Sequence, residues 1–122
     1  VHVLLIGNNC EGVAKSLSEM SAVKKVLHTE APHYENYLAE NFAPLVVKVS
    51  ENYTHIVCSA NTFGKNLMPR ISAHLDTSQV SDIIKVISPD TFLRPIALTS
   101  RSEKAAVHKA SLLIVGVPWL SL

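Results

Sequence analysis

The chain has 122 residues, 48% of them hydrophobic, and a formal net charge of +1 at pH 7. This length suits one domain with a real core that needs no disulfide or metal to fold. The near-neutral charge, with no basic run longer than Lys24-Lys25, argues against nucleic acid or an acidic membrane surface as a partner. The most apolar window, residues 111–122, is too short to span a bilayer, so we expect no membrane embedding.

The first half of the chain alternates between strand-like and helical patterns. Residues 1–6 predict a strand, residues 10–20 a helix and residues 23–28 a second strand. Residues 29–40 predict a loop with at most a short helical turn. Asn41 is expected to cap the next helix, with Pro44 in its first turn, although Val46-Val47 leaves a strand as an alternative. The apolar face of that helix would be Phe42, Leu45, Val46 and Val49.

Residues 54–75 predict a strand, a polar loop and a helix. The strand is the apolar run Ile56-Val57-Cys58, and the loop covers residues 59–66. The helix would place Leu67, Ile71 and Leu75 on one buried face, with Pro69 near its first turn. In open α/β sheets, ligands bind where a strand ends below the N-terminus of a helix, so this loop is a candidate site.

Four loop residues carry the binding hypothesis. Backbone N–H groups near Thr62, Gly64, Lys65 and Asn66 could hold a phosphate, and Lys65 would add a positive charge. The segment matches neither the GxxxxGK[ST] pattern nor the GxGxxG pattern of nucleotide sites. The alternative is a tight connection in which these side chains cap the helix, and the pattern favours it.

The remaining chain continues the alternation and then changes composition. Residues 81–87 predict a strand, residues 88–90 a turn and residues 91–96 an extended segment. Together these patterns predict an α/β domain with a mostly parallel sheet flanked by helices. Residues 97–110 are small and polar, and residues 112–117 return to a strand pattern. We therefore divide the chain into an α/β domain, 1–96, and a divergent tail, 97–122.

No set of residues predicts catalysis or a metal site. The six histidines show no metal-binding spacing, and Ser59 lacks the flanking glycines of a serine nucleophile. Cys10 and Cys58 are expected to be free, buried or half-buried thiols, since two cysteines without a CxxC pattern make no recognisable framework. We predict no catalytic residue in this chain.

Ordered motifs over residues 3–96 resemble one known family. The segment opening with YTHI at 53–56 is followed by a KN pair, a helix with the string MPR, an SD pair and DTF-x-R. These motifs resemble the N-terminal domain of the electron-transfer flavoprotein α subunit. The residues that fall on the family pattern are Asn66, Met68, Pro69, Arg70, Ser81, Asp82, Asp90, Thr91, Phe92 and Arg94.

The resemblance implies a Rossmann-like, three-layer domain of the adenine-nucleotide-hydrolase-like type. It also implies a heterodimer with a β subunit, which carries electrons on FAD from acyl-CoA and related dehydrogenases to a membrane quinone oxidoreductase. FAD would lie mainly in a separate C-terminal domain of the α subunit, and AMP, where present, in the β subunit. By the resemblance, the loop at 59–66 is not used for a nucleotide. The compartment would be the mitochondrial matrix in a eukaryote and the cytoplasm otherwise.

The chain departs from the family pattern after Ile96. The family continues with a YAGN segment there, whereas this chain has Ala97-Leu98-Thr99. Residues 115–119 stand where the FAD domain would begin with a glycine-rich loop, and they contain one glycine. The tail is thus expected to be a truncation, or a join across absent residues at the start of the FAD domain. The alternative function is a stand-alone α/β module that binds AMP or ATP.

Overall fold

A computed structural model describes residues 1–96, 99–104 and 112–116, and places their strands in two sheets. The larger sheet has the order β2-β1-β7-β3, and every neighbouring pair in it is parallel. Its strands are β1 (His2–Gly7), β2 (Lys25–Glu30), β7 (Leu112–Gly116) and β3 (His55–Cys58). The predicted strands at 1–6, 23–28 and 56–58 are therefore present, with small shifts at their ends.

The strand β7 lies inside the larger sheet. Its register pairs Val3 with Ile114 on one side and Val57 with Ile114 on the other. Sequence analysis assigned this segment to a tail, 97–122, outside the α/β domain. The pairing instead makes Leu112–Gly116 a strand of the same sheet as the first three strands. Strand patterning alone could not give its position, because an apolar run does not specify its neighbours.

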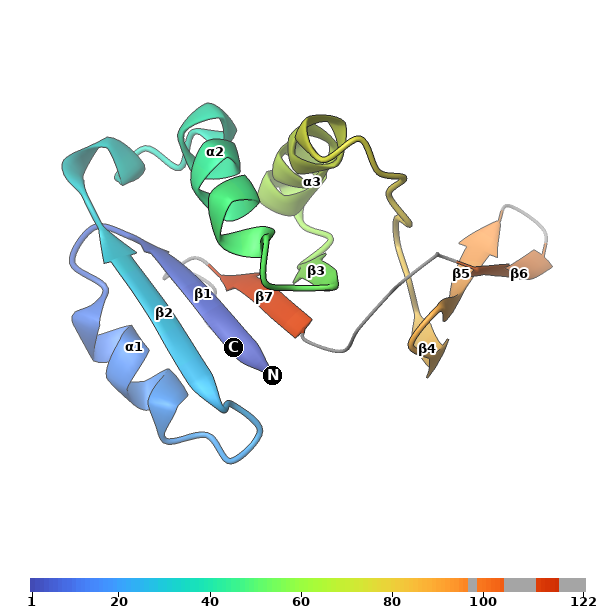
Figure 1. Cartoon of the computed structure of the whole chain (residues 1–122), viewed down its shortest axis with the longest axis horizontal. Helices are drawn as coiled ribbons and strands as arrows, with labels where there is room; N and C mark the ends of the chain where they lie inside the picture. The colour runs from blue at the N-terminus through green and yellow to red at the C-terminus, as the bar shows by residue number, and fades with distance from the viewer. Residues whose placement is uncertain (97–98, 105–111, 117–122) are drawn as a thin grey trace.

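Within the described residues, three α-helices pack around this sheet: α1 (Glu11–Ser18), α2 (Ala39–Ser50) and α3 (Thr62–His74). Figure 1 shows α2 and α3 side by side along one side of the sheet, with α1 beside β2 and away from them. Successive side chains of a strand point to opposite faces, so both faces of β1 need cover, and Val3, Leu4, Leu5 and Ile6 are all buried. The expected α/β class is confirmed.

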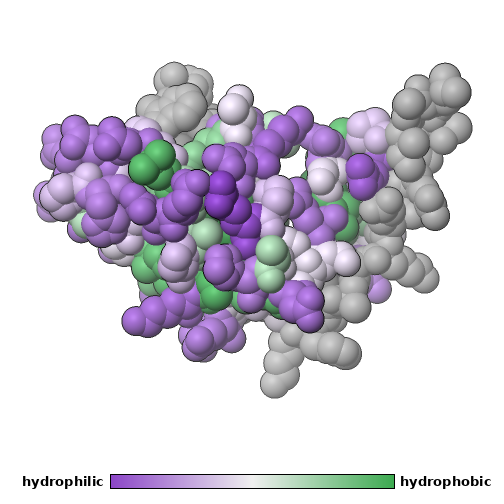
Figure 2. All heavy atoms as spheres, turned by 90° about the horizontal axis from the view of Figure 1, so that it is seen from above, coloured by the Kyte–Doolittle hydropathy of each residue, from purple (hydrophilic) through white to green (hydrophobic). Residues whose placement is uncertain are grey.

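The core lies between β1 and the pair α2 and α3. The side chains with the least exposure there are Leu4, Ile6, Phe42, Val46, Leu67 and Ile71. The predicted buried faces of both helices are thus confirmed, with Leu45, Val49 and Leu75 partly buried around that core. Figure 2 looks down on the outward side of these helices and shows a mostly hydrophilic surface, as expected for amphipathic helices.

Two details of helix ends differ from the sequence prediction. Helix α2 begins at Ala39 after the N-cap Leu38, so Asn41 lies within the first turn and donates its side-chain N–H to the carbonyl of His33, 2.8 Å away. That carbonyl belongs to a short 3-10 turn, η1 (Pro32–Tyr34), which fits the predicted loop with a short helical turn. Pro44 lies in the interior of α2 and Pro69 in the interior of α3, so neither proline is in a first turn as expected.

The second sheet corrects the expectation that the later strands continue a parallel sheet. It has the order β4-β5-β6, with β4 (Lys85–Ser88), β5 (Thr91–Ile96) and β6 (Thr99–Lys104) all antiparallel. The turn at Pro89 and Asp90 is only long enough for a hairpin, and parallel neighbours need a crossover of about a dozen residues. None of the helices in the described part of the chain is long and apolar enough to cross a membrane.

Candidate functional site

The N-terminus of α3 is the first candidate site, and it begins earlier than the sequence predicted. Asn61 is the N-cap, and its side-chain oxygen accepts a hydrogen bond from the backbone N–H of Gly64 at 2.9 Å. The backbone N–H of Lys65 donates to the carbonyl of Asn61, also at 2.9 Å. The expected polar loop at 59–66 is thus shorter. Thr62, Gly64, Lys65 and Asn66 all lie in the first turns of a helix.

The contacts of these residues are made within the chain. A Cβ on Gly64 would lie 1.9 Å from the carbonyl oxygen of Ser59, so the loop backbone fills the space beside this turn. Lys65 Nζ lies 3.2 Å from a carboxylate oxygen of Asp82, and Asn66 Oδ1 accepts a hydrogen bond from Arg70 Nε at 3.5 Å. Phosphate binding by these residues stays a prediction. The contacts favour the alternative, a capped connection between β3 and α3.

A second candidate site lies at the carboxyl ends of β1 and β2, where Cys10, His28 and Glu30 meet. Cys10 Sγ and Glu30 Oε1 each lie 3.1 Å from His28 Nε2. The backbone N–H of Cys10 donates to Glu30 Oε1 at 2.6 Å. One atom from each side chain therefore falls in a single group whose members all lie within 4.8 Å of one another.

The local fold explains why these three residues meet. His28 and Glu30 are two residues apart on β2, so both side chains point to the same face of the strand. The β1–β2 register places Glu30 opposite Gly7. Asn9 then adopts a left-handed conformation, with φ of 57°, which an asparagine tolerates and which turns the chain toward α1. Cys10 follows as the N-cap residue of α1, beside the end of β2.

The surroundings shift the protonation of two members of this cluster. Burial raises the pKa of the Cys10 thiol, and its hydrogen bond to Glu30 and the charge of that carboxylate raise it further. The pKa of the Glu30 carboxyl is lowered, chiefly by the hydrogen bond from the Cys10 backbone N–H. In this state the cluster holds a neutral thiol beside an ionised carboxylate. A thiol whose pKa is raised is less ready to act as a thiolate nucleophile than a free cysteine.

Sequence analysis missed this cluster for an identifiable reason. The second strand was expected to end at His28, which would put Glu30 in a loop with no defined direction. The pattern His-Thr-Glu at 28–30 was the available signal, because alternate residues of a strand share a face. If the first two strands are parallel neighbours, their carboxyl ends lie at the same edge of the sheet. Cys10, which follows the first strand, would then lie close to His28 and Glu30 on the second.

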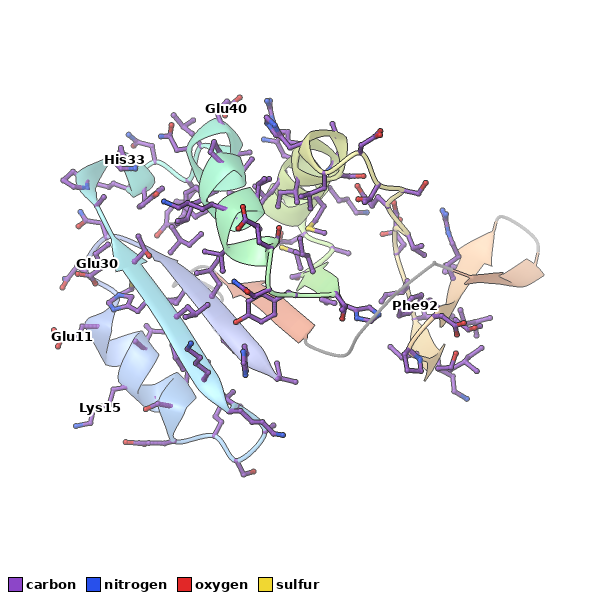
Figure 3. All side chains as sticks on the ribbon, viewed as in Figure 1. Glu11, Lys15, Glu30, His33, Glu40 and Phe92 are labelled. Atoms are coloured by element: carbon purple, nitrogen blue, oxygen red, sulfur yellow. The ribbon has the colours of Figure 1, made fainter. Side chains whose placement is uncertain are left out.

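A third feature is a cavity of about 480 Å³ between β3, α3 and the strand β5. Its lining includes Tyr53, Met68, Ile71 and Phe92, and it is mostly apolar. His55 borders it and joins the two sheets, because its Nε2–H donates to the carbonyl of Pro89 at 2.6 Å. Figure 3 labels Phe92 beside this junction, and its ring packs edge-on against the imidazole of His55.

Comparison with known proteins places this α/β domain in a family. The sequence profile of the electron transfer flavoprotein domain matches residues 1–114. The chain belongs to the electron transfer flavoprotein domain family. The resemblance drawn from the motifs at residues 53–94 is thereby confirmed, and the matched range extends beyond the boundary set at residue 96.

Three relatives show how much of a longer protein this chain covers. It is 40% identical over 120 residues to the electron transfer flavoprotein subunit alpha of Pseudomonas aeruginosa, which covers 95% of this chain and 39% of the relative. The mitochondrial subunit alpha of Dictyostelium discoideum is 41% identical over 103 residues, or 79% and 29% of the two chains. The Paracoccus denitrificans subunit alpha is 40% identical over 96 residues, or 79% and 31%. The chain thus spans well under half the length of these relatives.

Proposed function

We propose that this chain is the N-terminal docking domain of an electron transfer flavoprotein α subunit. The observation that carries the proposal is an exposed apolar surface on and beside β4, formed by Ile84, Val86 and Ile87. These residues are 63%, 61% and 55% exposed, the highest values among the large hydrophobic residues that the structure describes. Ile84 and Val86 alternate along the chain and share one face, whereas Ile87 follows at a register shift in the strand. Exposed large apolar side chains gathered on one short segment indicate a protein–protein contact.

The strand β4 is also suited to a partner by its place in the sheet. It is an edge strand of the three-stranded antiparallel sheet, so one side of its backbone pairs with no other strand among the residues that the structure describes. An apolar edge strand is an aggregation hazard unless something covers it. The partner we assign to this surface is the β subunit, because the relatives are named electron transfer flavoprotein subunit alpha, and an α subunit implies a β subunit.

The same proposal covers the chemistry of the assembled carrier. FAD would carry the electrons, held outside the residues described here, and AMP would belong to the β subunit. Acyl-CoA and related dehydrogenases would be the donors and a membrane quinone oxidoreductase the acceptor. The chain itself would act as a carrier subunit and not as an enzyme. The parallel sheet and its helices support a Rossmann-like, three-layer domain.

The proposed compartment depends on the source of the chain. Two of the relatives described above are bacterial proteins, and the one from Dictyostelium discoideum is named as mitochondrial. We propose the mitochondrial matrix for a eukaryotic source and the cytoplasm for a bacterial one. Subcellular fractionation of the source cells, with the chain detected by antibody, tests this assignment.

Co-expression with a β subunit tests the docking proposal. The chain should co-purify with the β subunit, and the double variant Val86→Ser/Ile87→Ser should bind it at least about tenfold more weakly, equivalent to roughly 1.4 kcal/mol. Leu38→Ser is the matched control, because Leu38 is 51% exposed but lies at the start of α2, far along the chain from β4. The proposal fails if the native chain does not bind, or if both variants bind equally well.

A further inference from the structure

The cluster of Cys10, His28 and Glu30 presents three different metal-ligand atoms to one point. A thiol sulfur, an imidazole nitrogen and a carboxylate oxygen are the three donor types that Zn²⁺ takes in proteins. Zinc–ligand bonds of about 2.0–2.3 Å at tetrahedral angles put neighbouring ligand atoms roughly 3.3–3.6 Å apart. The two distances to His28 Nε2 are 3.1 Å, a few tenths of an ångström short of that spacing, and all three ligand atoms lie within 4.8 Å of one another.

Charge and burial at the cluster also suit a divalent cation. A thiolate and a carboxylate together carry two negative charges and a neutral imidazole carries none, so a dication gives a neutral centre in a partly buried position. Cys10 is buried, whereas the side chains of His28 and Glu30 are 27% and 38% exposed. The protein therefore closes the back of the cluster and leaves its front open for an ion to enter. The open side also leaves a fourth position for water.

The surrounding backbone already orients one ligand. The N–H of Cys10 holds Glu30 Oε1, which fixes the carboxylate next to the imidazole before any ion binds. Hydrogen bonds of this outer kind align metal ligands and raise affinity. Figure 3 labels Glu30 at the carboxyl end of β2, the edge of the sheet where the cluster lies.

We propose that Cys10 Sγ, His28 Nε2 and a carboxylate oxygen of Glu30 form a binding site for one Zn²⁺ ion, with water as the fourth ligand. Binding forms a zinc–sulfur bond and releases the thiol proton of Cys10 to solvent, with no change of oxidation state. Magnesium and calcium are disfavoured, because they prefer oxygen ligands only. The site does not depend on the docking function proposed above.

Cobalt titration of the tag-free chain, kept reduced, tests this proposal. Co²⁺ takes the place of Zn²⁺ in such sites and reports a sulfur ligand by a thiolate-to-metal charge-transfer band. The band should saturate at one Co²⁺ per chain and disappear when Zn²⁺ is added. Zn²⁺ should also raise the thermal midpoint in a concentration-dependent way, and a chelator should reverse that rise.

Matched variants separate this site from incidental binding. Cys10→Ser, His28→Gln and Glu30→Gln should each lower Zn²⁺ affinity by more than the roughly 10–100-fold seen when an outer-shell partner is lost. Cys58→Ala removes the other thiol and His33→Ala removes a histidine that lies close in sequence to His28, and both variants should leave Zn²⁺ affinity unchanged. Circular dichroism shows which variants fold, and His28→Gln at a partly exposed position remains informative if Cys10→Ser does not. The proposal is overturned if the native chain gives no charge-transfer band, or if the band survives in Cys10→Ser or vanishes in Cys58→Ala.

Discussion

Replacing Gly64 with alanine should destabilise the chain, whereas the same change at Gly12 should stabilise it. Both glycines lie in the first turn of a helix, Gly12 in α1 and Gly64 in α3. A Cβ at Gly12 meets nothing within 4 Å, so the substitution should gain up to about 1 kcal/mol of helix propensity. A Cβ at Gly64 would lie 1.9 Å from the Ser59 carbonyl oxygen and 3.1 Å from Cys58 Sγ.

The magnitude follows from how far the backbone must move. Real Cβ contacts essentially never fall below 3.0 Å, so the Ser59 carbonyl or the start of α3 must shift by about an ångström. Overpacking of this kind costs about 1–3 kcal/mol, and the shift also strains the Asn61 cap, which contributes about 1 kcal/mol. After the gain in helix propensity, Gly64→Ala should lose about 2 kcal/mol, or roughly 8 °C in thermal midpoint at this chain length.

Urea denaturation of both variants beside the native chain measures the difference directly. We expect the free energy of unfolding to be highest for Gly12→Ala, intermediate for the native chain and lowest for Gly64→Ala. If Gly64→Ala proves as stable as Gly12→Ala, the close approach of Ser59 to α3 is refuted. The assignment of this turn as a packed connection between strand and helix then falls with it.

Three further predictions concern a cap, the core and a thiol. Asn61→Ala should lower the free energy of unfolding by about 1 kcal/mol in urea denaturation, because the Gly64 N–H loses its acceptor. Asn61→Ser should keep most of that stability, since a serine oxygen can also accept this hydrogen bond. Equal losses in the two variants would contradict the cap. Phe42→Ala should cost about 3–5 kcal/mol, since its fully buried ring packs edge-on against Tyr34 and Phe63, and a loss under 1 kcal/mol would refute that core. Burial raises the pKa of the Cys58 thiol above its unfolded value, so its stabilising contribution is full below about pH 8.5 and is lost as pH rises through the folded value. The native chain should therefore lose stability relative to Cys58→Ala in urea denaturation over that alkaline range, and a pH-independent difference would contradict this.

The sequence by itself determined the helices, the first three strands and the family, but not the strand β6. Hydrophobic spacing placed Phe42 and Val46 on one helix face and Leu67 and Ile71 on another, because a period of 3.6 residues leaves few ways to bury those side chains. The first three strands of the sheet followed from short apolar runs. Motifs spread along residues 53–94 were specific enough to indicate the electron transfer flavoprotein family, which the match over residues 1–114 confirms.

The tertiary structure alone decided which segments meet. The strand β7 enters the sheet between β1 and β3 from more than fifty residues away in sequence, a pairing that depends on backbone hydrogen bonds common to every strand. Cys10, His28 and Glu30 come together only because β1 and β2 are parallel neighbours in one register and Asn9 turns the chain back. Periodicity reports which face of an element is buried, whereas strand order and register depend on packing across the whole domain. The candidate zinc site depends on strand order and register, and so only the tertiary structure shows it.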